Sequence, residues 1–352
     1  MKILYVPRGT YSQPLVKREY RKIKESLFFF DQEGFFEHSL HACADVTECR
    51  LEEADMKCKG NEYDWIIVNW KQSGHKDEME RAKAIMDATE RRSVRRALLV
   101  SAAQAEYMPP ETILDAVDVI FKREPFRDRS RYKLSEDNRA KIVPTVISCP
   151  FVRAPKNTLP GRLFSLFYPH VRTCEIEEVQ YDVGFSGADA VEHTLRQDVW
   201  RRVIDEGFST IGGLQQNPNT KKPIPGPLRG SRLQGSAYRN ALCRAKINLA
   251  LDGIGEYTFR HQEILCVGVF MMSSPSIREL DLLIPLRENE HYVAFDNLDD
   301  MAEKIRYYLA HDSERQRIAA AGKELFDTYY DPKRHGRELM TALHAAAARQ
   351  RC

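Results

Sequence analysis

An arginine and a glutamate three residues apart, Arg260 and Glu263, have the types and spacing needed to bind one ligand together. They lie in the segment Lys246–Ser274, near the start of a helix predicted over 258–266. Side chains three positions apart share one face of a helix. A guanidinium can donate a pair of hydrogen bonds to phosphate oxygens, and a carboxylate can accept hydrogen bonds from ribose hydroxyls. The pair therefore suits a nucleoside diphosphate, such as the carrier of an activated sugar.

The residues around this pair predict a strand, a loop, a helix and a second strand. Apolar runs favour strands over 246–252 and 269–274, and Gly253 and Gly255 mark the loop between the first strand and the helix. In open α/β sheets, ligands bind beyond the carboxyl ends of strands, close to loop glycines and helix N-termini. The competing interpretation is an exposed ion pair on the helix, which has no function and contributes a few tenths of a kcal/mol. The glycine loop before the helix and Gly268 after it favour the ligand site.

This segment resembles the donor-site signature of the GT-B glycosyltransferases, especially the group-1 and CgeB-like families. The signature is roughly R-x-x-E-x-x-x-x-G followed by a buried strand, and Arg260, Glu263 and Gly268 have this spacing. The resemblance implies an α/β fold of two Rossmann-like domains whose parallel sheets face a cleft, with the nucleotide held mainly by the C-terminal domain. It implies a nucleoside-diphosphate sugar as donor, a UDP-sugar above all, and no required metal or other cofactor. It covers the last half of the chain, and the first half matches only in its order of elements.

The resemblance assigns Arg260 to the diphosphate and Glu263 to the ribose. A second stretch, VQYDVGFSGA, resembles the opening strand and glycine turn of the same donor domain. The further residues expected near the nucleotide lie at the turns after strands, with one at the start of the motif strand: Gly9, Ser186, Gly187, Arg196, Lys246, Gly255, Tyr257 and Thr258. A routine tight turn explains Gly187 equally well, and Lys246 can equally face solvent.

The implied chemistry is electrostatic stabilisation of the leaving diphosphate by Arg260, Lys246 and the helix amides. Many retaining group-1 enzymes carry two glutamates with seven residues between them, whereas Glu256 and Glu263 have six between them. A role for Glu256 at the donor sugar and a retaining mechanism therefore both stay open. An inverting enzyme needs a general base from the first domain. His75 and Glu106 are the candidates, and for both an exposed surface side chain is the competing interpretation.

The alternation of predicted strands and helices indicates two doubly wound parallel sheets. Strands are expected over 2–6, 36–41, 65–69, 97–101, 117–121, 142–148, 183–187 and 288–297, besides the two of the motif. Helices are expected over 195–205, 238–245, 313–326 and 333–348, and another is expected to begin at 298. A further helix is expected around a core stripe of Val16, Tyr20, Ile23, Leu27 and Phe30. A surface loop is expected over 215–234. The domain division is 1–155 (acceptor side), 156–178 (connection), 179–330 (nucleotide sugar) and 331–352 (a helix crossing back to the first domain).

Composition limits the function classes. The 352 residues suit two domains, and 53 basic against 51 acidic side chains give a net charge of +2. This balance argues against wholesale binding to nucleic acid or membrane. Two local arginine clusters, at 91–96 and 123–131, could attract an anionic acceptor or a phospholipid surface, or could be solvated faces.

Eight cysteines without a C-x-x-C pair predict reduced thiols and no metal site. The N-terminal MKILYVPRGT resembles a first strand more than a secretory signal, and no apolar run has the length of a membrane span. We therefore expect a cytoplasmic protein.

The acceptor stays open among glycans, lipid-linked sugars, small metabolites, proteins and modified DNA. The competing class is a Rossmann protein that binds a nucleotide for regulation without catalysis. A dehydrogenase is disfavoured, because Pro7-Arg8-Gly9-Thr10 follows the first strand where G-x-G-x-x-G would be needed.

Overall fold

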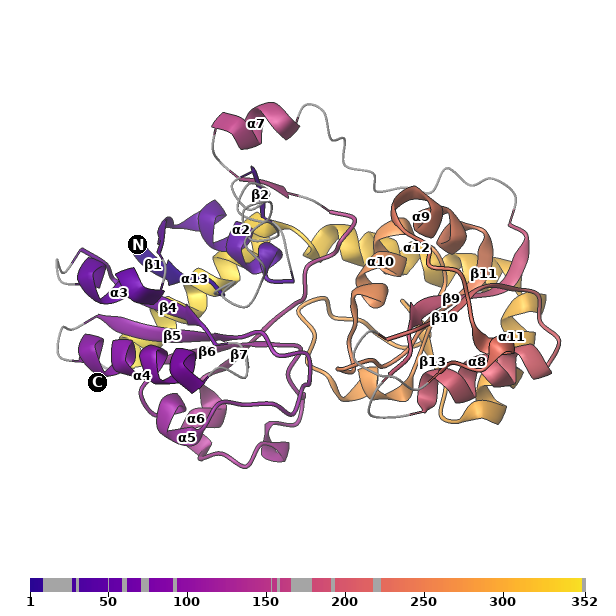
Figure 1. Cartoon of the computed structure of the whole chain (residues 1–352), viewed down its shortest axis with the longest axis horizontal. Coiled ribbons are helices and arrows are strands. Elements are labelled where there is room, and N and C mark those ends of the chain that lie inside the picture. Colours follow the sequence, from indigo (N-terminus) through magenta and orange to yellow (C-terminus); the bar gives the residue numbers. More distant parts are fainter. Residues whose placement is uncertain are drawn as a thin grey trace.

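The chain forms two parallel β-sheets, one from each half of the sequence, as predicted (Figure 1). The structure is a computed structural model. It describes residues 1–8, 27–29, 32–49, 51–58, 62–70, 76–90, 94–152, 154–156, 159–165, 179–190, 194–217 and 223–349.

The first sheet has six strands in the order β3-β1-β4-β5-β6-β7, all paired in parallel. The strands are β1 (Lys2–Val6), β3 (Asp45–Glu48), β4 (Trp65–Asn69), β5 (Arg95–Val100), β6 (Val119–Arg123) and β7 (Ile142–Thr145). Every residue of β4 is buried, as its unbroken apolar sequence predicts for a strand covered on both faces.

The expected strand over 36–41 is wrong, because these residues belong to a helix, α2 (Gly34–Cys43). Phe36 and Leu40 are four positions apart and both buried, which is the spacing of one helix face. The other helices of this half are α3 (Leu51–Cys58), α4 (Lys76–Glu90), α5 (Glu111–Leu114), α6 (Glu136–Ala140) and the short 3₁₀ helix η1 (Arg129–Arg131). Of the expected stripe from Val16 to Phe30, all but Leu27 lies outside the described residues. Next to Leu27, β2 (Phe28–Phe29) pairs antiparallel with β8 (Ala154–Pro155).

The second sheet has five parallel strands in the order β10-β9-β11-β12-β13. They are β9 (Tyr181–Ala188), β10 (Thr210–Gln215), β11 (Ala245–Ala250), β12 (Met271–Ser273) and β13 (Val293–Ala294). The sequence did not predict β10, because Gly212 and Gly213 interrupt its apolar pattern. Both glycines have positive φ, and a Cβ on Gly212 would lie 1.9 Å from the carbonyl oxygen of Phe185. The expected loop over 215–234 contains η2 (Gly226–Leu228), and its residues 218–222 lie outside the described part.

The helices of the second half follow the predicted order. They are α7 (Leu159–Ser165), α8 (Leu195–Asp205), α9 (Gly235–Cys243), α10 (Phe259–Val267), η3 (Pro275–Glu279), α11 (Leu298–Ala310), α12 (Asp312–Tyr329) and α13 (Pro332–Arg349). The last of these, α13, lies beside α2 of the first half (Figure 1). Its His335 is buried, and the Nε2 atom of that ring lies 3.0 Å from Oγ1 of Thr145 at the end of β7.

A second bridge between the halves uses the predicted arginine cluster. Residues Phe126 and Leu280 form an antiparallel bridge, Arg129 Nη2 lies 2.6 Å from Asp281 Oδ2, and Arg131 pairs with Glu279. One cluster of buried apolar side chains also includes residues from both sheets. Arg129 and Arg131 are therefore ion-paired across the two halves, and the suggested attraction of an anionic partner stays a prediction.

Cys43, Cys49, Cys149 and Cys266 are thiols without a disulfide, whereas Cys243 is disulfide-bonded. The expectation of reduced thiols throughout is therefore wrong at Cys243. None of the helices in the described part of the chain has the length and apolar character needed to cross a bilayer.

The contact between α13 and α2 gives a test of stability. A Cβ added at Gly336 would lie 2.4 Å from the carbonyl oxygen of Ser39 and 2.6 Å from Sγ of Cys43. Helix propensity alone favours Gly336→Ala by about 1 kcal/mol. Because the added methyl group has no room, we expect the opposite sign, a loss of about 1–3 kcal/mol in the free energy of unfolding measured with urea. The exposed neighbour Arg337→Ala is the control and should change little; a stabilised Gly336→Ala variant would show that the helices do not pack this closely.

Candidate active site

The second sheet has a topological switch point between β9 and β11. Strand β10 lies on one side of β9, whereas β11, β12 and β13 follow on the other side. At such a point the loops after two adjacent strands leave in opposite directions and open a crevice at the carboxyl edge. Ser186 and Gly187 lie at the end of β9, and the loop 251–258 joins β11 to α10. The topology therefore places the two sequence-predicted segments side by side.

The start of α10 is fixed by a buried histidine. The backbone N–H of Thr258 donates to Nδ1 of His261 at 3.0 Å, and Nε2 of the same ring lies 3.0 Å from Oγ of Ser273 on β12. Burial lowers the pKa of His261 to about 3, so the ring is neutral. Because Nδ1 accepts, Nε2 carries the proton and donates to Ser273. His261 thus closes the helix start in the way a glutamate does in a capping box.

Arg260 lies between two aromatic rings. Its guanidinium carbon is 5.0 Å from the ring centre of Phe185 and 5.3 Å from that of Tyr238. The Nη1 atom is buried without a hydrogen-bond partner among the described residues. Ring faces attract a cation without occupying its N–H groups. The arginine is therefore held in place while hydrogen-bond donors of its guanidinium remain available to an anion.

Glu263 lies on the same helix and is 8% exposed. Its Oε2 atom accepts a hydrogen bond from the hydroxyl of Tyr238 at 2.7 Å. Burial raises the pKa of Glu263, and the charge of Arg260 and the bond from Tyr238 oppose this rise. Neither member of the pair thus points into bulk solvent, and one tyrosine of α9 contacts both.

Arg196 on α8 has a different environment. Its Nε donates to the carbonyl oxygen of Asp252 at 2.6 Å, Nη1 to that of Ala188 at 2.5 Å and Nη2 to that of Leu251 at 3.1 Å. Burial, together with the nearby charge of Arg260, lowers the pKa of Arg196 to about 10. Because its donors bind the carbonyls that end β9 and β11, Arg196 joins these strand ends. The expected contact of Arg196 with a diphosphate stays a prediction, and in this structure its donors bind backbone carbonyls instead.

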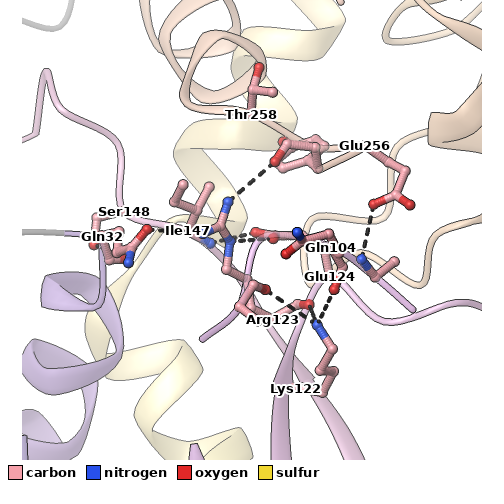
Figure 2. A network of polar contacts seen from close by, with 12 residues as sticks. Gln32, Gln104, Lys122, Arg123, Glu124, Ile147, Ser148, Glu256 and Thr258 are labelled. Atoms are coloured by element: carbon pink, nitrogen blue, oxygen red, sulfur yellow. Dashed lines mark hydrogen bonds and ion pairs between the residues drawn. The ribbon is translucent and has the colours of Figure 1, made fainter. Parts of the chain in front are cut away.

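The loop before α10 packs against the first half of the chain (Figure 2). A Cβ on Gly255 would lie 1.9 Å from the carbonyl oxygen of Ala103, so glycine is required for this approach. Glu256 accepts a hydrogen bond from the backbone N–H of Ala105 at 3.0 Å. The carbonyl oxygen of Tyr257 accepts from Nη2 of Arg123 at 3.4 Å. Gly255, Glu256 and Tyr257 therefore form part of the contact between the two halves.

Three consecutive charged residues at the end of β6 support this contact from the other side (Figure 2). Arg123 Nε donates to Glu124 at 2.6 Å, and the other carboxylate oxygen of Glu124 accepts from the backbone N–H of Ile147 at 2.6 Å. Lys122 is fully buried, and burial lowers its pKa to about 7. Its ammonium donates to the carbonyl oxygens of Ala102, Gln104 and Arg123.

The sequence analysis missed this group. The available signal was Lys-Arg-Glu directly after a buried apolar strand, since charged residues there must find partners. It also missed Phe185 and Tyr238, because aromatic residues in a strand and a helix are usually core residues.

The remaining predicted residues are spread over several places. Lys246 begins β11 at the edge opposite the loop 251–258, so the structure does not bring it to the crevice. Gly187 lies within β9, which continues to Ala188, and the Oγ atom of Ser186 accepts a hydrogen bond from Gln215 at 2.8 Å. Glu106 lines a separate groove of about 680 Å³ with Tyr107 and Arg131. Gly9 and His75 lie outside the described residues.

No metal centre is evident in the described part of the chain, where no three His, Cys, Asp or Glu side chains come together as ligands. Arg260 lies close enough to Arg196 and Glu263 to influence the pKa of both.

Comparison with known families agrees with this architecture. Residues 199–341, which include β10 to β13 and α10, match the family described as glycosyl transferase-like. No curated protein matches this sequence.

Solved structures similar to this chain share its two-sheet fold at low sequence identity. A glycosyltransferase from Rickettsia africae has a TM-score of 0.54 and 10% identity, with 98% of each chain covered. HepE of Anabaena, solved in complex with UDP and glucose, has a TM-score of 0.52 and 9% identity, with 98% of this chain and all of that chain covered. These similarities show the GT-B fold.

The neutral His261 predicts a loss of stability in acid. Its pKa is lowered from 6.5 to about 3 in the folded protein, so the unfolded chain binds the extra proton between these values. The stabilisation is complete above pH 6.5 and is lost as the pH falls towards 3, by about 1 kcal/mol for each pH unit. We expect His261→Gln to show a smaller loss of unfolding free energy between pH 7 and pH 5 than the wild type. The exposed His311→Gln variant is the control and should keep the wild-type slope; equal slopes for all three proteins would contradict the neutral cap.

Proposed function

We propose that this chain, which has the GT-B fold and matches a glycosyl transferase-like family over residues 199–341, is a glycosyltransferase. In this proposal it transfers a sugar from a nucleoside-diphosphate sugar, bound at the β9–β11 crevice, without a metal ion. The observation that carries the donor site is the guanidinium of Arg260, which two aromatic rings hold beside the buried carboxylate of Glu263. HepE, whose structure contains UDP and glucose, supports a UDP-sugar as the first donor to test.

In this proposal Arg260 binds the diphosphate. As the glycosidic bond breaks, negative charge grows on the leaving nucleoside diphosphate, and a cation that is already in place stabilises it without further reorganisation. The N–H groups of the first turn of α10 lie at the positive end of the helix dipole, and they also favour negative charge there. Arg196 contributes its charge from behind the loop, although its N–H groups bind backbone carbonyls.

Glu263 binds the ribose. Its carboxylate has one oxygen bonded to Tyr238, and the other oxygen is left to accept from ribose hydroxyls. The nearby charge of Arg260 favours the ionised form that such acceptance needs.

Retention and inversion both stay open, and Glu256 and Glu106 are the residues that bear on the choice. Because its carboxylate binds the backbone of Ala105, Glu256 links the two halves in this conformation. A base for an inverting reaction would have to come from the first half, and Glu106 follows Ala105 directly in the chain. Glu106 also borders the groove with Tyr107, which offers space for an acceptor next to the donor loop.

The proposal assigns to each segment of the chain the role expected from the sequence. Residues 1–155 supply the acceptor side, 156–178 connect, 179–330 bind the donor and 331–352 return to the first domain. The cytoplasmic location stays an expectation from the sequence, and the disulfide at Cys243 removes one of the observations on which it rested. The acceptor stays open among a glycan, a lipid-linked sugar, a small metabolite, a protein and modified DNA. A DNA acceptor is disfavoured, because Arg129 and Arg131 are already ion-paired to acidic residues of this chain.

A donor screen tests the proposal. The protein is incubated with UDP-, GDP- and dTDP-sugars, and both release of the sugar and the shift of the melting temperature are measured. We expect one nucleotide to stabilise the protein and its sugar to be released slowly to water. Stabilisation by a nucleoside diphosphate without any sugar release, with or without added acceptors, would instead support a regulatory nucleotide-binding protein.

The ribose role predicts the effect of Glu263→Ala. Removing the acceptor of the ribose hydroxyls should weaken nucleoside-diphosphate binding by about 1–3 kcal/mol, measured by calorimetry, with little loss of fold stability. Glu303→Ala, an exposed glutamate on α11, is the matched control. Unchanged nucleotide affinity in Glu263→Ala would remove this residue from the site.

The diphosphate role predicts the effect of Arg260→Ala. Loss of a preorganised donor at the leaving group should lower turnover about 100-fold, while the melting temperature changes little. Arg306→Ala, an exposed arginine on α11, is the matched control and should keep wild-type turnover. Normal turnover in Arg260→Ala would exclude it from the mechanism.

A further inference from the structure

We propose that Tyr238 is a positioning residue that sets the geometry of both ligand-binding side chains, its hydroxyl acting on Glu263 and its ring on Arg260. This inference rests on the proposed function of the β9–β11 crevice. Tyr238 comes from α9, which precedes β11 in the chain, so it reaches the pair from an element outside the recognised signature.

The hydroxyl of Tyr238 determines how Glu263 presents its carboxylate. The bond from Tyr238 to Oε2 is 2.7 Å long, which is a strong geometry for a hydroxyl donating to a carboxylate. A glutamate side chain has three rotatable bonds, and a bond to one oxygen fixes the direction of the other. Burial raises the pKa of Tyr238 far above its usual range, so the phenol stays protonated and remains a donor. The free oxygen of Glu263 is thereby aimed before any ligand arrives.

The ring of Tyr238 determines where the guanidinium of Arg260 lies. The ring centre of Tyr238 is 5.3 Å from the guanidinium carbon, and the ring centre of Phe185 is 5.0 Å from the same atom. Arg196 is held in a different way. Backbone carbonyl oxygens fix its position by accepting hydrogen bonds from its guanidinium N–H groups, so these donors are occupied. An aromatic clamp fixes position without that occupation. This difference explains how one arginine can be both rigid and free to bind an anion.

Tyr238 is itself anchored from the first half of the chain. Its ring centre is 5.8 Å from that of Phe151, with the planes inclined by 50°, which is a favourable tilted contact. Phe151 lies two residues after Cys149, whose backbone N–H donates a hydrogen bond to the hydroxyl of Tyr330 at 2.7 Å. The chain leaving the first sheet thus supports the residue that orients the donor site in the second.

Two variants separate the two actions of Tyr238. Tyr238→Phe removes the hydroxyl and keeps the ring, so it should release Glu263 and leave Arg260 held. Tyr238→Leu removes both. Tyr181→Phe is the matched control. Tyr181 also lies under an arginine, since the guanidinium carbon of Arg244 is 5.2 Å from its ring centre, but it lies away from the pair Arg260 and Glu263.

The test measures the affinity of the full-length wild type and each variant for UDP, for 2′,3′-dideoxy-UDP and for inorganic pyrophosphate, together with donor kinetics. We expect Tyr238→Phe to bind UDP about tenfold more weakly, with unchanged affinity for dideoxy-UDP and pyrophosphate, because only the ribose contact is lost. Its donor KM should rise while kcat is kept. Tyr238→Leu should also lose affinity for pyrophosphate and lose kcat, and Tyr181→Phe should match the wild type.

Three results would overturn the inference while the wild type still binds UDP. They are wild-type UDP affinity in Tyr238→Phe, an equal loss for UDP and dideoxy-UDP in that variant, and wild-type pyrophosphate affinity in Tyr238→Leu. Melting temperatures of the unliganded proteins show whether a variant is folded, and Tyr238→Phe, which keeps the ring packing, decides the question if Tyr238→Leu does not fold. A wild type that binds no nucleoside diphosphate would overturn the proposed function and this inference together.

Discussion

The site depends on a guanidinium that is held in place without using up its hydrogen-bond donors. Burying a charged group with an unpaired donor is costly unless other interactions compensate. Here the faces of Phe185 and Tyr238 provide electrostatic attraction, and Glu263 provides a nearby opposite charge. An anionic ligand would supply the missing hydrogen bonds to Arg260. The cost of leaving that donor unpaired in the free protein is thus part of the affinity for the ligand.

A second constraint is the close contact between the two halves. Gly255, Glu256 and Tyr257 of the donor loop bind the backbone of 103–105 and the side chain of Arg123. Helix α13 adds a contact on α2, far from this loop in sequence. Because the same loop follows β11 and leads into α10, the first half of the chain contacts the segment that positions α10.

The arginines illustrate how far a sequence reaches. Arg196 and Arg260 were both predicted near a diphosphate, and both lie near the crevice. The partners of their guanidinium groups differ. Arg196 donates hydrogen bonds to the carbonyl oxygens at the ends of two strands, whereas the contacts of Arg260 among the described residues are with ring faces. The cluster from Arg123 to Arg131 similarly suggests a basic surface, but Arg123, Arg129 and Arg131 are ion-paired within the chain. The sequence determines which residues carry charge, whereas the fold determines whether a charged group is already paired within the chain.

Local patterns in the sequence determined the parallel sheets, most helix positions and the loop before α10, because apolar periodicity and glycine placement act over a few residues. The prediction was wrong at 36–41, because the apolar residues there fit both helical and strand spacing. Strand β10 was not predicted, because two glycines interrupt its apolar pattern. The local patterns could indicate that Arg260 and Glu263 share a helix face. Only the tertiary structure decided that Tyr238 and Phe185 surround them, that Lys246 lies at the far edge of β11 and that Glu256 faces the other half, because these contacts join residues distant in the chain through strand order and packing.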